Sequence, residues 1–218
     1  TGKSFSVIAR LVQEREAQAQ IAPTLLIAPT SVLGNWLKEI EKFAPQLRSQ
    51  IHHGSERISE IDAFRTAITH CDVVITSYTL ARKDEALLSQ IAWHRIVIDE
   101  AQNIKNPRAS QTKAICKLPA RHRLALTGTP IENRLLDLWS IFNFLNPGYL
   151  GKEAQFRQAF EAPRQKENDE LRAAMLKKLV EPFILRRVKT DPAIIQDLPD
   201  KIEQKLYCHL TKEQAALY

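Results

Sequence analysis

The first residues of the chain have the types and spacing of a phosphate-binding loop. Gly2-Lys3-Ser4 leads directly into residues 5–20, whose pattern predicts a helix. At a helix start, backbone N–H groups and the helix dipole bind phosphate, a lysine contacts the β- and γ-phosphate oxygens, and a serine ligates magnesium. The first glycine of the full G-x-x-x-x-G-K-[ST] pattern would precede residue 1. The tripeptide therefore indicates a nucleotide site, and a chance surface Gly-Lys-Ser is the alternative.

Two adjacent carboxylates follow a short apolar run further along the chain. Residues 96–98 (Ile-Val-Ile) predict a buried strand, and Asp99 and Glu100 come directly after it. A Mg-nucleotide site requires such a pair, because one carboxylate holds the water shell of the ion and the other orients the attacking water. We assign the first task to Asp99 and the second to Glu100. A solvated turn is the alternative, but a carboxylate pair at a strand end with an upstream Gly-Lys-Ser is much rarer by chance than either piece.

Hydroxyl groups follow the next apolar run. Residues 126–130 (Leu-Thr-Gly-Thr-Pro) leave this run through a tight turn that carries Thr127 and Thr129. Hydroxyls beside the carboxylates could sense the γ-phosphate and relay its loss to the rest of the domain. A Gly-Thr-Pro sequence is equally compatible with a plain turn. This interpretation therefore depends on the order of the three elements along the chain.

The segments around these motifs alternate between two patterns. Uninterrupted runs of Val, Ile and Leu are typical of strands buried on both faces of a parallel sheet, and apolar residues at helical spacing separate them. Such alternation predicts an α/β sheet with right-handed crossovers. The predicted strands are residues 24–28, 49–53, 72–76, 95–98 and 123–127, and the helices between them include residues 32–43 and 56–69.

After Pro147-Gly148 the pattern changes, because two helices follow without a strand between them. Residues 153–162 and 167–180 have amphipathic helical spacing. Residues 201–209 alternate charged and apolar residues as a late strand would. The expected organisation is an α/β lobe over residues 1–150, a helical insert over residues 151–200, and a strand with the start of a further helix over residues 201–218.

The composition is that of an ordinary soluble globular protein. The 218 residues carry a formal net charge of +6, with 44% hydrophobic and 26% charged residues, which excludes collagen, coiled coil and disorder. No apolar run has the ~18 residues that a membrane span needs, and the N-terminus has no signal-peptide pattern, so we expect a soluble intracellular protein. The three cysteines are far apart and form no C-x-x-C pair. They indicate neither a disulfide framework nor a zinc site.

Positive charge is concentrated after the carboxylate pair. Residues 101–131 contain no Asp or Glu, and a stretch of one sign attracts polyanions such as nucleic acid. A solvated helix face is the alternative. The basic residues of this stretch are Lys105, Arg108, Lys113, Lys117, Arg121 and Arg123.

Together these motifs resemble the first RecA-like lobe of the Swi/Snf-type ATPases, DNA translocases within helicase superfamily two. The resemblance covers nearly the whole chain, and residues 99–107 look like those of prokaryotic members. It implies a RecA-like P-loop domain with a central, mostly parallel β-sheet flanked by helices, plus a C-terminal helical insertion. Besides Gly2-Lys3-Ser4, the matching stretches are residues 26–31, 35–36, 76–78, 99–102, 105–106, 126–133, 137–139, 183–187 and 198–199.

The resemblance implies a role for each motif. Lys3, Asp99 and Glu100 are the implied catalytic residues, and Ser4 and Asp99 the ligands of Mg²⁺. Gln102 stands where many family members have His, and it is expected to bridge to motif III by hydrogen bonds. The implied ATP-binding residues are Gly2, Lys3, Ser4, Gln102 and, in motif III, Thr127, Gly128 and Thr129. The implied DNA-binding residues are Pro29, Thr30, Ser31, Asn35, Thr76, Ser77, Tyr78, Lys105, Arg186 and Arg187.

The implied ligands are ATP, Mg²⁺ and duplex DNA. The implied partners are the second RecA-like lobe of the parent protein and DNA-bound proteins that are remodelled. In the family the second lobe supplies an arginine finger, so we expect the chain alone to hydrolyse ATP barely or not at all. A monomer is the family's default. The expected location is the cytoplasm, with nucleoid association, for a prokaryotic member and the nucleus for a eukaryotic one.

Two other interpretations stay open. One is the lobe of an RNA-directed helicase of superfamily two, and the other is a nucleic-acid-binding module without hydrolysis. The helical insert and the Arg186-Arg187 segment favour the Swi/Snf branch. Trp36 and Trp139 are expected in the core, since apolar neighbours at helical spacing surround each of them.

Overall fold

The computed structural model describes residues 2–18, 20–128, 135–161 and 166–185. Residues 1–179 form one compact unit and residues 180–218 a second. Within the second unit the described part is residues 180–185, which include the 3₁₀ turn η3 (Glu181–Phe183). The predictions for Thr129, Arg186, Arg187 and the strand at residues 201–209 lie outside the described residues.

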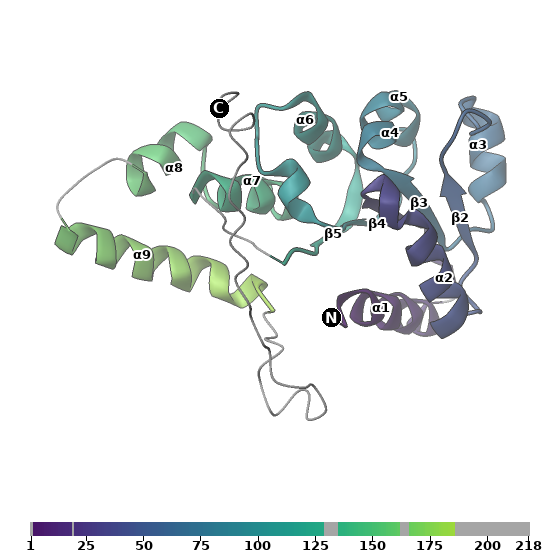
Figure 1. Ribbon diagram of the computed structural model, residues 1–218, viewed down its shortest axis with the longest axis horizontal. Helices are drawn as coiled ribbons and strands as arrows, with labels where there is room; N and C mark the ends of the chain where they lie inside the picture. Colours follow the sequence, from purple (N-terminus) through teal and green to yellow (C-terminus); the bar gives the residue numbers. More distant parts are fainter. Residues whose placement is uncertain (1, 19, 129–134, 162–165, 186–218) are drawn as a thin grey trace, which may run out of the picture. The chain divides into compact units, whose positions relative to one another are not determined.

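A parallel sheet of five strands forms the centre of the first unit (Figure 1). Its strand order is β2-β3-β1-β4-β5, and all four neighbouring pairs are parallel. β1 is therefore the middle strand, although it comes first in the chain. The strands are β1 (Thr24–Ala28), β2 (Ser49–His52), β3 (Val73–Ser77), β4 (Trp93–Ile98) and β5 (Ala120–Ala125).

Helices cover both faces of this sheet, as Figure 1 shows. Successive side chains of a strand point to opposite faces, so Leu26 packs with Ile8 and Trp36 on one face while Leu25 contributes to the core of the other. The first face is covered by α1 (Lys3–Ala17) and α2 (Leu33–Phe43). The other face is covered by α3 (Ile61–Ile68), α4 (Tyr78–Lys83), α5 (Glu85–Leu88), α6 (Ser110–Lys117) and α7 (Leu135–Leu145).

The residues that flank α8 (Glu153–Phe160) form hydrogen bonds with α7. The backbone N–H of Leu136 donates to Oε1 of Glu161 at 3.0 Å, and Nε1 of Trp139 donates to the carbonyl of Gly151 at 3.1 Å. None of the helices in the described part of the chain is long and apolar enough to cross a membrane. The remaining elements are the 3₁₀ turns η1 (Thr30–Val32) and η2 (Ala101–Ile104), α8 (Glu153–Phe160) and α9 (Lys166–Val180).

The five strands predicted within residues 24–127 are present, and the boundary of β5 differs most from its prediction. β1 spans the predicted residues 24–28. β5 spans residues 120–125 instead of 123–127, because it pairs with β4 from Ala120 opposite Trp93. It is an edge strand whose side chains are partly or fully exposed. Edge strands lack burial on both faces, so an apolar run marks their ends poorly.

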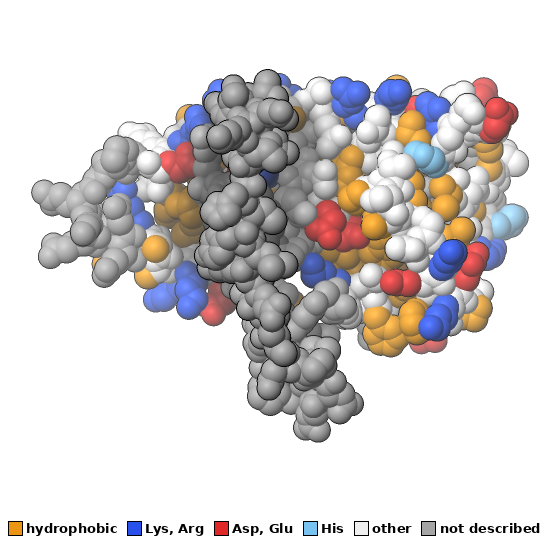
Figure 2. Space-filling view, in the orientation of Figure 1, with side chains coloured by type: hydrophobic (Ala, Val, Ile, Leu, Met, Phe, Trp, Pro, Cys, Tyr) orange, Lys and Arg blue, Asp and Glu red, His pale blue; other side chains and the backbone are white. Residues whose placement is uncertain are grey.

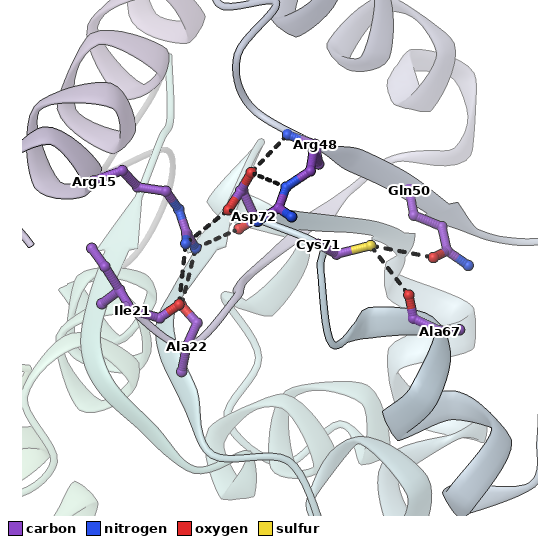
Figure 3. Close-up of polar contacts among 8 residues, drawn as sticks. All are labelled: Arg15, Ile21, Ala22, Arg48, Gln50, Ala67, Cys71 and Asp72. Carbon is purple, nitrogen blue, oxygen red and sulfur yellow. Dashed lines mark hydrogen bonds and ion pairs between the residues drawn. The ribbon is translucent and has the colours of Figure 1, made fainter. Parts of the chain in front are cut away.

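A cluster of charged groups links α1, β1 and β3 where the strands begin (Figure 3). The carboxylate of Asp72, with 5% of its side chain exposed, lies 2.8 Å from Nη1 of Arg15. It also accepts hydrogen bonds from the backbone N–H of Arg48 at 2.8 Å and from its Nε at 3.1 Å. Arg15 donates in addition to the carbonyls of Ile21 and Ala22. One carboxylate therefore joins the end of α1 to the starts of the edge strand β2 and its neighbour β3.

This cluster makes folding stability depend on pH. Burial raises the pKa of Asp72, but the hydrogen bonds from Arg48 and the charge of Arg15 outweigh burial and hold this pKa below its ordinary value. A carboxyl group with a lowered folded-state pKa stabilises the fold above its unfolded pKa of about 3.9. That stabilisation is lost as the pH falls through the folded-state pKa.

Replacing Asp72 by Asn is expected to lower the free energy of unfolding at pH 7 by about 2 kcal/mol, because charge-assisted hydrogen bonds are lost. Urea unfolding measures this change, and the difference from the unsubstituted chain should shrink below about pH 4. The control is Asp62→Asn, whose carboxylate is 86% exposed and 4.0 Å from Arg65; it should leave stability unchanged. Equal stability of both variants at pH 7 would contradict the prediction.

Candidate functional site

Segments far apart in the sequence meet at the carboxyl ends of the central strands. The backbone N–H of Asp99, directly after β4, donates to the carbonyl of Ile27 in β1 at 2.8 Å. The N–H of Leu126 donates to Ile98, and the N–H of Ala101 donates back to Leu126, both at 2.8 Å. The carboxylate pair and the hydroxyl turn therefore lie side by side. They occupy the edge of the sheet at which α/β proteins bind ligands.

The Gly-Lys-Ser segment begins α1, as predicted, and contributes a cation to the same place. Gly2 is the N-cap residue and has a φ of 72°, a conformation that glycine adopts without strain. Having no side chain, it leaves the first N–H groups of the helix without a side-chain cap. Nζ of Lys3 lies 3.7 Å from the point at which a Cβ atom on Gly128 would be. The ammonium group thus lies beside Gly128, which follows Thr127.

The carboxylate of Asp99 is held by hydrogen bonds to both of its oxygens. Nε1 of Trp36, in α2, donates to Oδ2 at 2.9 Å. The backbone N–H of Glu100 donates to Oδ1, also at 2.9 Å. Each carboxylate oxygen can accept a further interaction. Asp99 is therefore oriented without being saturated.

Glu100 combines a strained backbone with a bridged carboxylate. Among the described residues it is the only non-glycine residue with a positive φ, 52° with ψ 59°, and this left-handed conformation costs about 1–3 kcal/mol. Its Oε2 accepts a hydrogen bond from Nε2 of Gln102 at 2.7 Å. Oε1 of Gln102 accepts in turn from Oγ1 of Thr127 at 3.1 Å. This confirms the expected hydrogen-bonded bridge from Gln102 to the hydroxyl turn.

The donor set at this edge fits a magnesium nucleotide. The helix start at Gly2 and the ammonium group of Lys3 suit phosphate oxygens. The hydroxyl of Ser4 and the carboxylate of Asp99 are hard oxygen ligands, and magnesium bound with phosphates takes only one or two protein carboxylates and keeps several waters. Within the described residues no group of three or more His, Cys, Asp and Glu side chains could hold a metal ion.

The residues expected to contact DNA divide into exposed and buried groups. Thr30, Ser31 and Asn35 are exposed at the start of η1 and α2, and Pro29 is half-buried. They follow the carboxyl end of β1, next to the carboxylate pair. Lys105 is half-buried and lines an open hollow of about 380 Å³. Thr30, Ser31 and Asn35 therefore lie at the surface of the protein.

The Thr76-Ser77-Tyr78 segment is buried, so its side chains do not form part of an exposed surface. Thr76 is 0% exposed and its hydroxyl donates to a carbonyl of β2 at 3.0 Å. The hydroxyl of Ser77 caps α4 by accepting a backbone N–H at 3.3 Å. The hydroxyl of Tyr78 donates to the carbonyl of Asp99 at 2.6 Å. These residues support the site from inside the fold, and we leave their side chains out of the proposed DNA surface.

The basic stretch after Gln102 does not form one surface. Arg123 is half-buried and donates to carbonyls at the ends of α6 and α7. Arg108 pairs with Glu153 at 3.1 Å, and Lys117 with Glu85 at 3.2 Å. On the face drawn in Figure 2, Lys and Arg side chains are interspersed with Asp and Glu. α6 leads the later basic residues from the carboxyl edge of the sheet toward the start of β5, so much of the stretch matches a solvated helix face.

Comparison with known proteins decides the family. The model of the SNF2-related domain matches residues 1–218. The chain belongs to the SNF2-related domain family. This SNF2-related domain is 46% identical over 217 residues to the putative ATP-dependent helicase/translocase YwqA of Bacillus subtilis. The aligned region covers 100% of this chain and 23% of YwqA. It is 38% identical over 215 residues to the TATA-binding protein-associated factor MOT1 of Saccharomyces cerevisiae. That aligned region covers 94% of this chain and 11% of MOT1.

Solved structures agree with the fold of this SNF2-related domain. The Sulfolobus solfataricus SWI2/SNF2 ATPase core in complex with dsDNA is similar with a TM-score of 0.78 and 45% identity, over 99% of this chain and 44% of that one. The SWI2/SNF2 ATPase core domain from the same organism is similar with a TM-score of 0.75 and 46% identity, over 100% of this chain and 43% of that one. The RecA-like fold predicted from the motifs is therefore confirmed. The chain spans between a tenth and a quarter of the curated relatives' length.

Two site residues of the SNF2-related domain were not predicted as such. Trp36 is buried, 3% exposed, as expected of a core residue, but its indole N–H is bonded to Asp99. Tyr78 was predicted at the DNA, whereas its hydroxyl contacts motif II. A buried Trp or Tyr needs a partner for its polar group. This rule predicts that the Trp36 N–H and the Tyr78 O–H each have a hydrogen-bond acceptor. It does not predict which atom that acceptor is.

Proposed function

We propose that this chain is the ATP-binding lobe of a DNA-dependent ATPase that moves along duplex DNA and remodels protein–DNA complexes. The observation that carries the proposal is the meeting of Lys3, the Asp99-Glu100 pair and the Thr127-Gly128 turn at one edge of the sheet. Membership of the SNF2-related family supports ATP as the nucleotide. We assign residues 1–150 to this lobe and residues 151–200 to a helical insert.

The proposed mechanism assigns one task to each group. The start of α1 and Lys3 bind the phosphates, and Ser4 and Asp99 supply protein oxygens near Mg²⁺, which neutralises charge on the phosphates when bound. Glu100 orients the attacking water toward the γ-phosphate. Gln102, bonded to both the Glu100 carboxylate and the Thr127 hydroxyl, couples the carboxylate to motif III. Gly128 and Thr129 complete motif III in this proposal.

DNA would bind beside the nucleotide site, at the exposed loop after β1. Thr30, Ser31 and Asn35 present short polar groups that can bond to phosphate oxygens without selecting a base. Lys105 adds positive charge on the same edge of the sheet. The similar Sulfolobus ATPase core was solved in complex with dsDNA, which supports duplex DNA here. The family resemblance adds Arg186 and Arg187 as a brace for DNA or for a second lobe.

The nucleic acid that stimulates ATP turnover tests this function. The experiment uses the protein in which this chain is joined to a second RecA-like lobe, without nucleic acid, with duplex DNA and with RNA. We expect stimulation by duplex DNA and none in a Lys3→Ala protein, which serves as the blank. Stimulation by RNA instead would favour an RNA-directed helicase. Absence of turnover under all conditions would favour a module that binds nucleic acid without hydrolysis.

A further inference from the structure

The buried side chain of Trp36 donates a hydrogen bond to the Asp99 carboxylate. Its indole ring is 3% exposed in the core between α2 and the sheet, so the ring itself cannot swing away. Nε1–H donates to Oδ2 of Asp99 at 2.9 Å, and the N–H of Glu100 holds Oδ1 at the same distance. Two donors on the two oxygens fix the plane of the carboxylate. With Glu100 alone as donor, the group could rotate about its Cβ–Cγ bond.

Tyr78 controls the backbone of the same pair. It is 5% exposed, and its hydroxyl donates to the carbonyl of Asp99 at 2.6 Å, with the carbonyl of Glu100 at 3.4 Å. Asn103 also donates to the Glu100 carbonyl, from its backbone N–H at 3.0 Å and Nδ2 at 2.8 Å. A strained residue persists only where its surroundings hold it in this way.

We propose that Trp36 and Tyr78 are positioning residues of the carboxylate pair. Trp36 sets the plane in which Asp99 meets the water shell of magnesium, and Tyr78 holds the left-handed backbone that aims Glu100. Each residue acts on the nucleotide site through its hydrogen bond to motif II. The assignment rests on the proposed function, since it concerns the same magnesium nucleotide site.

The chain contains a matched control for Trp36. Trp93 is 2% exposed, and its Nε1 donates to the carbonyl of Leu88 at 2.9 Å. It begins β4, at the end of the sheet opposite to Asp99. Trp36→Phe and Trp93→Phe each remove one buried indole N–H bond and a similar volume. A purely structural effect would be alike in both variants.

The first readout is the magnesium dependence of ATP turnover in the two-lobed protein. Trp36→Phe is expected to raise the half-saturating Mg²⁺ concentration about 10-fold or more, since outer-shell partners of a metal site typically contribute 10- to 100-fold. Turnover should recover toward the unsubstituted rate at saturating Mg²⁺. Trp93→Phe should keep the unsubstituted half-saturation. Equal half-saturation in the two variants would overturn the assignment of Trp36.

Tyr78→Phe tests the role of Tyr78 in positioning Glu100 separately from the role of Trp36. It removes only the hydroxyl, so kcat is expected to fall about 10-fold or more while the half-saturating Mg²⁺ concentration stays unchanged. A raised Mg²⁺ requirement with unchanged kcat would overturn the assignment to Glu100. An unsubstituted protein with no Mg²⁺-dependent turnover would instead contradict the proposed function, and with it both assignments.

A second readout does not need turnover. The 218-residue chain has three tryptophans, whose indole N–H resonances can be assigned by Trp→Phe substitution. In an Asp99→Ala chain the resonance of Trp36 should move upfield, because a charge-assisted bond is lost, while those of Trp93 and Trp139 stay in place. An unmoved Trp36 resonance would overturn the hydrogen bond on which the assignment depends. This result is independent of whether the protein hydrolyses ATP.

Discussion

Replacing Glu100 by Gln is expected to reduce DNA-stimulated ATP turnover in the two-lobed protein by about 10²- to 10⁴-fold, the usual contribution of a general base or water-orienting carboxylate. The amide has almost the same shape, and its oxygen can still accept the bond from Gln102. It does not carry the charge that draws a proton from the attacking water. The variant should therefore bind ATP and DNA normally and fail in the chemical step.

The measurement is phosphate release in a single turnover, together with binding of a fluorescent ATP analogue. Glu41→Gln, at an exposed position on α2, is the control for a change of charge and should behave like the unsubstituted protein. Turnover of the Glu100 variant within a few-fold of the unsubstituted rate would show that another group orients the water. Loss of ATP binding would show that Glu100 supports the site itself.

The 218-residue chain alone is expected to hydrolyse ATP about 10³- to 10⁵-fold more slowly than the protein that contains a second RecA-like lobe, because such factors come from an arginine finger. In the proposed function that arginine belongs to the second lobe. Among the described residues, the hydrogen bonds and ion pairs observed for arginine side chains are with groups other than the site residues Lys3, Asp99 and Glu100.

Both proteins should be compared at saturating Mg²⁺, ATP and duplex DNA. Replacing the finger arginine of the second lobe by alanine provides the matched control, and this variant should turn over as slowly as the isolated chain. A fluorescent ATP analogue shows whether the chain binds nucleotide under the same conditions. DNA-stimulated hydrolysis by the chain alone at a rate comparable to that of the two-lobed protein would contradict the prediction.

The sheet and the place of the nucleotide motifs could be predicted from sequence for one physical reason. Strands buried on both faces leave uninterrupted apolar runs, as residues 24–28 do, and the carboxyl ends of parallel strands share one edge. Because Asp99 and Thr127 are each predicted at the carboxyl end of a strand, the sequence also predicts that they lie close together. Lys3 followed from its position at a helix start.

Other features depend on tertiary contacts that residue types do not reveal. The carbonyl of Glu100, the residue with the left-handed backbone, is contacted by the hydroxyl of Tyr78, which begins α4 in a different part of the chain. The sequence alone assigned the Thr76 hydroxyl to a DNA contact. In the structure β2 pairs with β3, the strand that carries Thr76, and a carbonyl of β2 accepts the hydrogen bond from this hydroxyl. Arg123 resembled part of a DNA-binding surface, whereas it binds carbonyls at helix ends. In each case the deciding partner lies outside the local sequence pattern.

The strand order β2-β3-β1-β4-β5 also affects how the protein folds during synthesis. β1 has five buried residues and leaves the ribosome first, but both of its neighbours, β3 and β4, are made later. Parallel pairing of such distant segments is slow, and unpaired apolar strands in a growing chain promote aggregation. The topology that gathers the site at one edge therefore leaves the buried, apolar strand β1 unpaired until β3 emerges, and residues 24–28 are exposed to aggregation for that time.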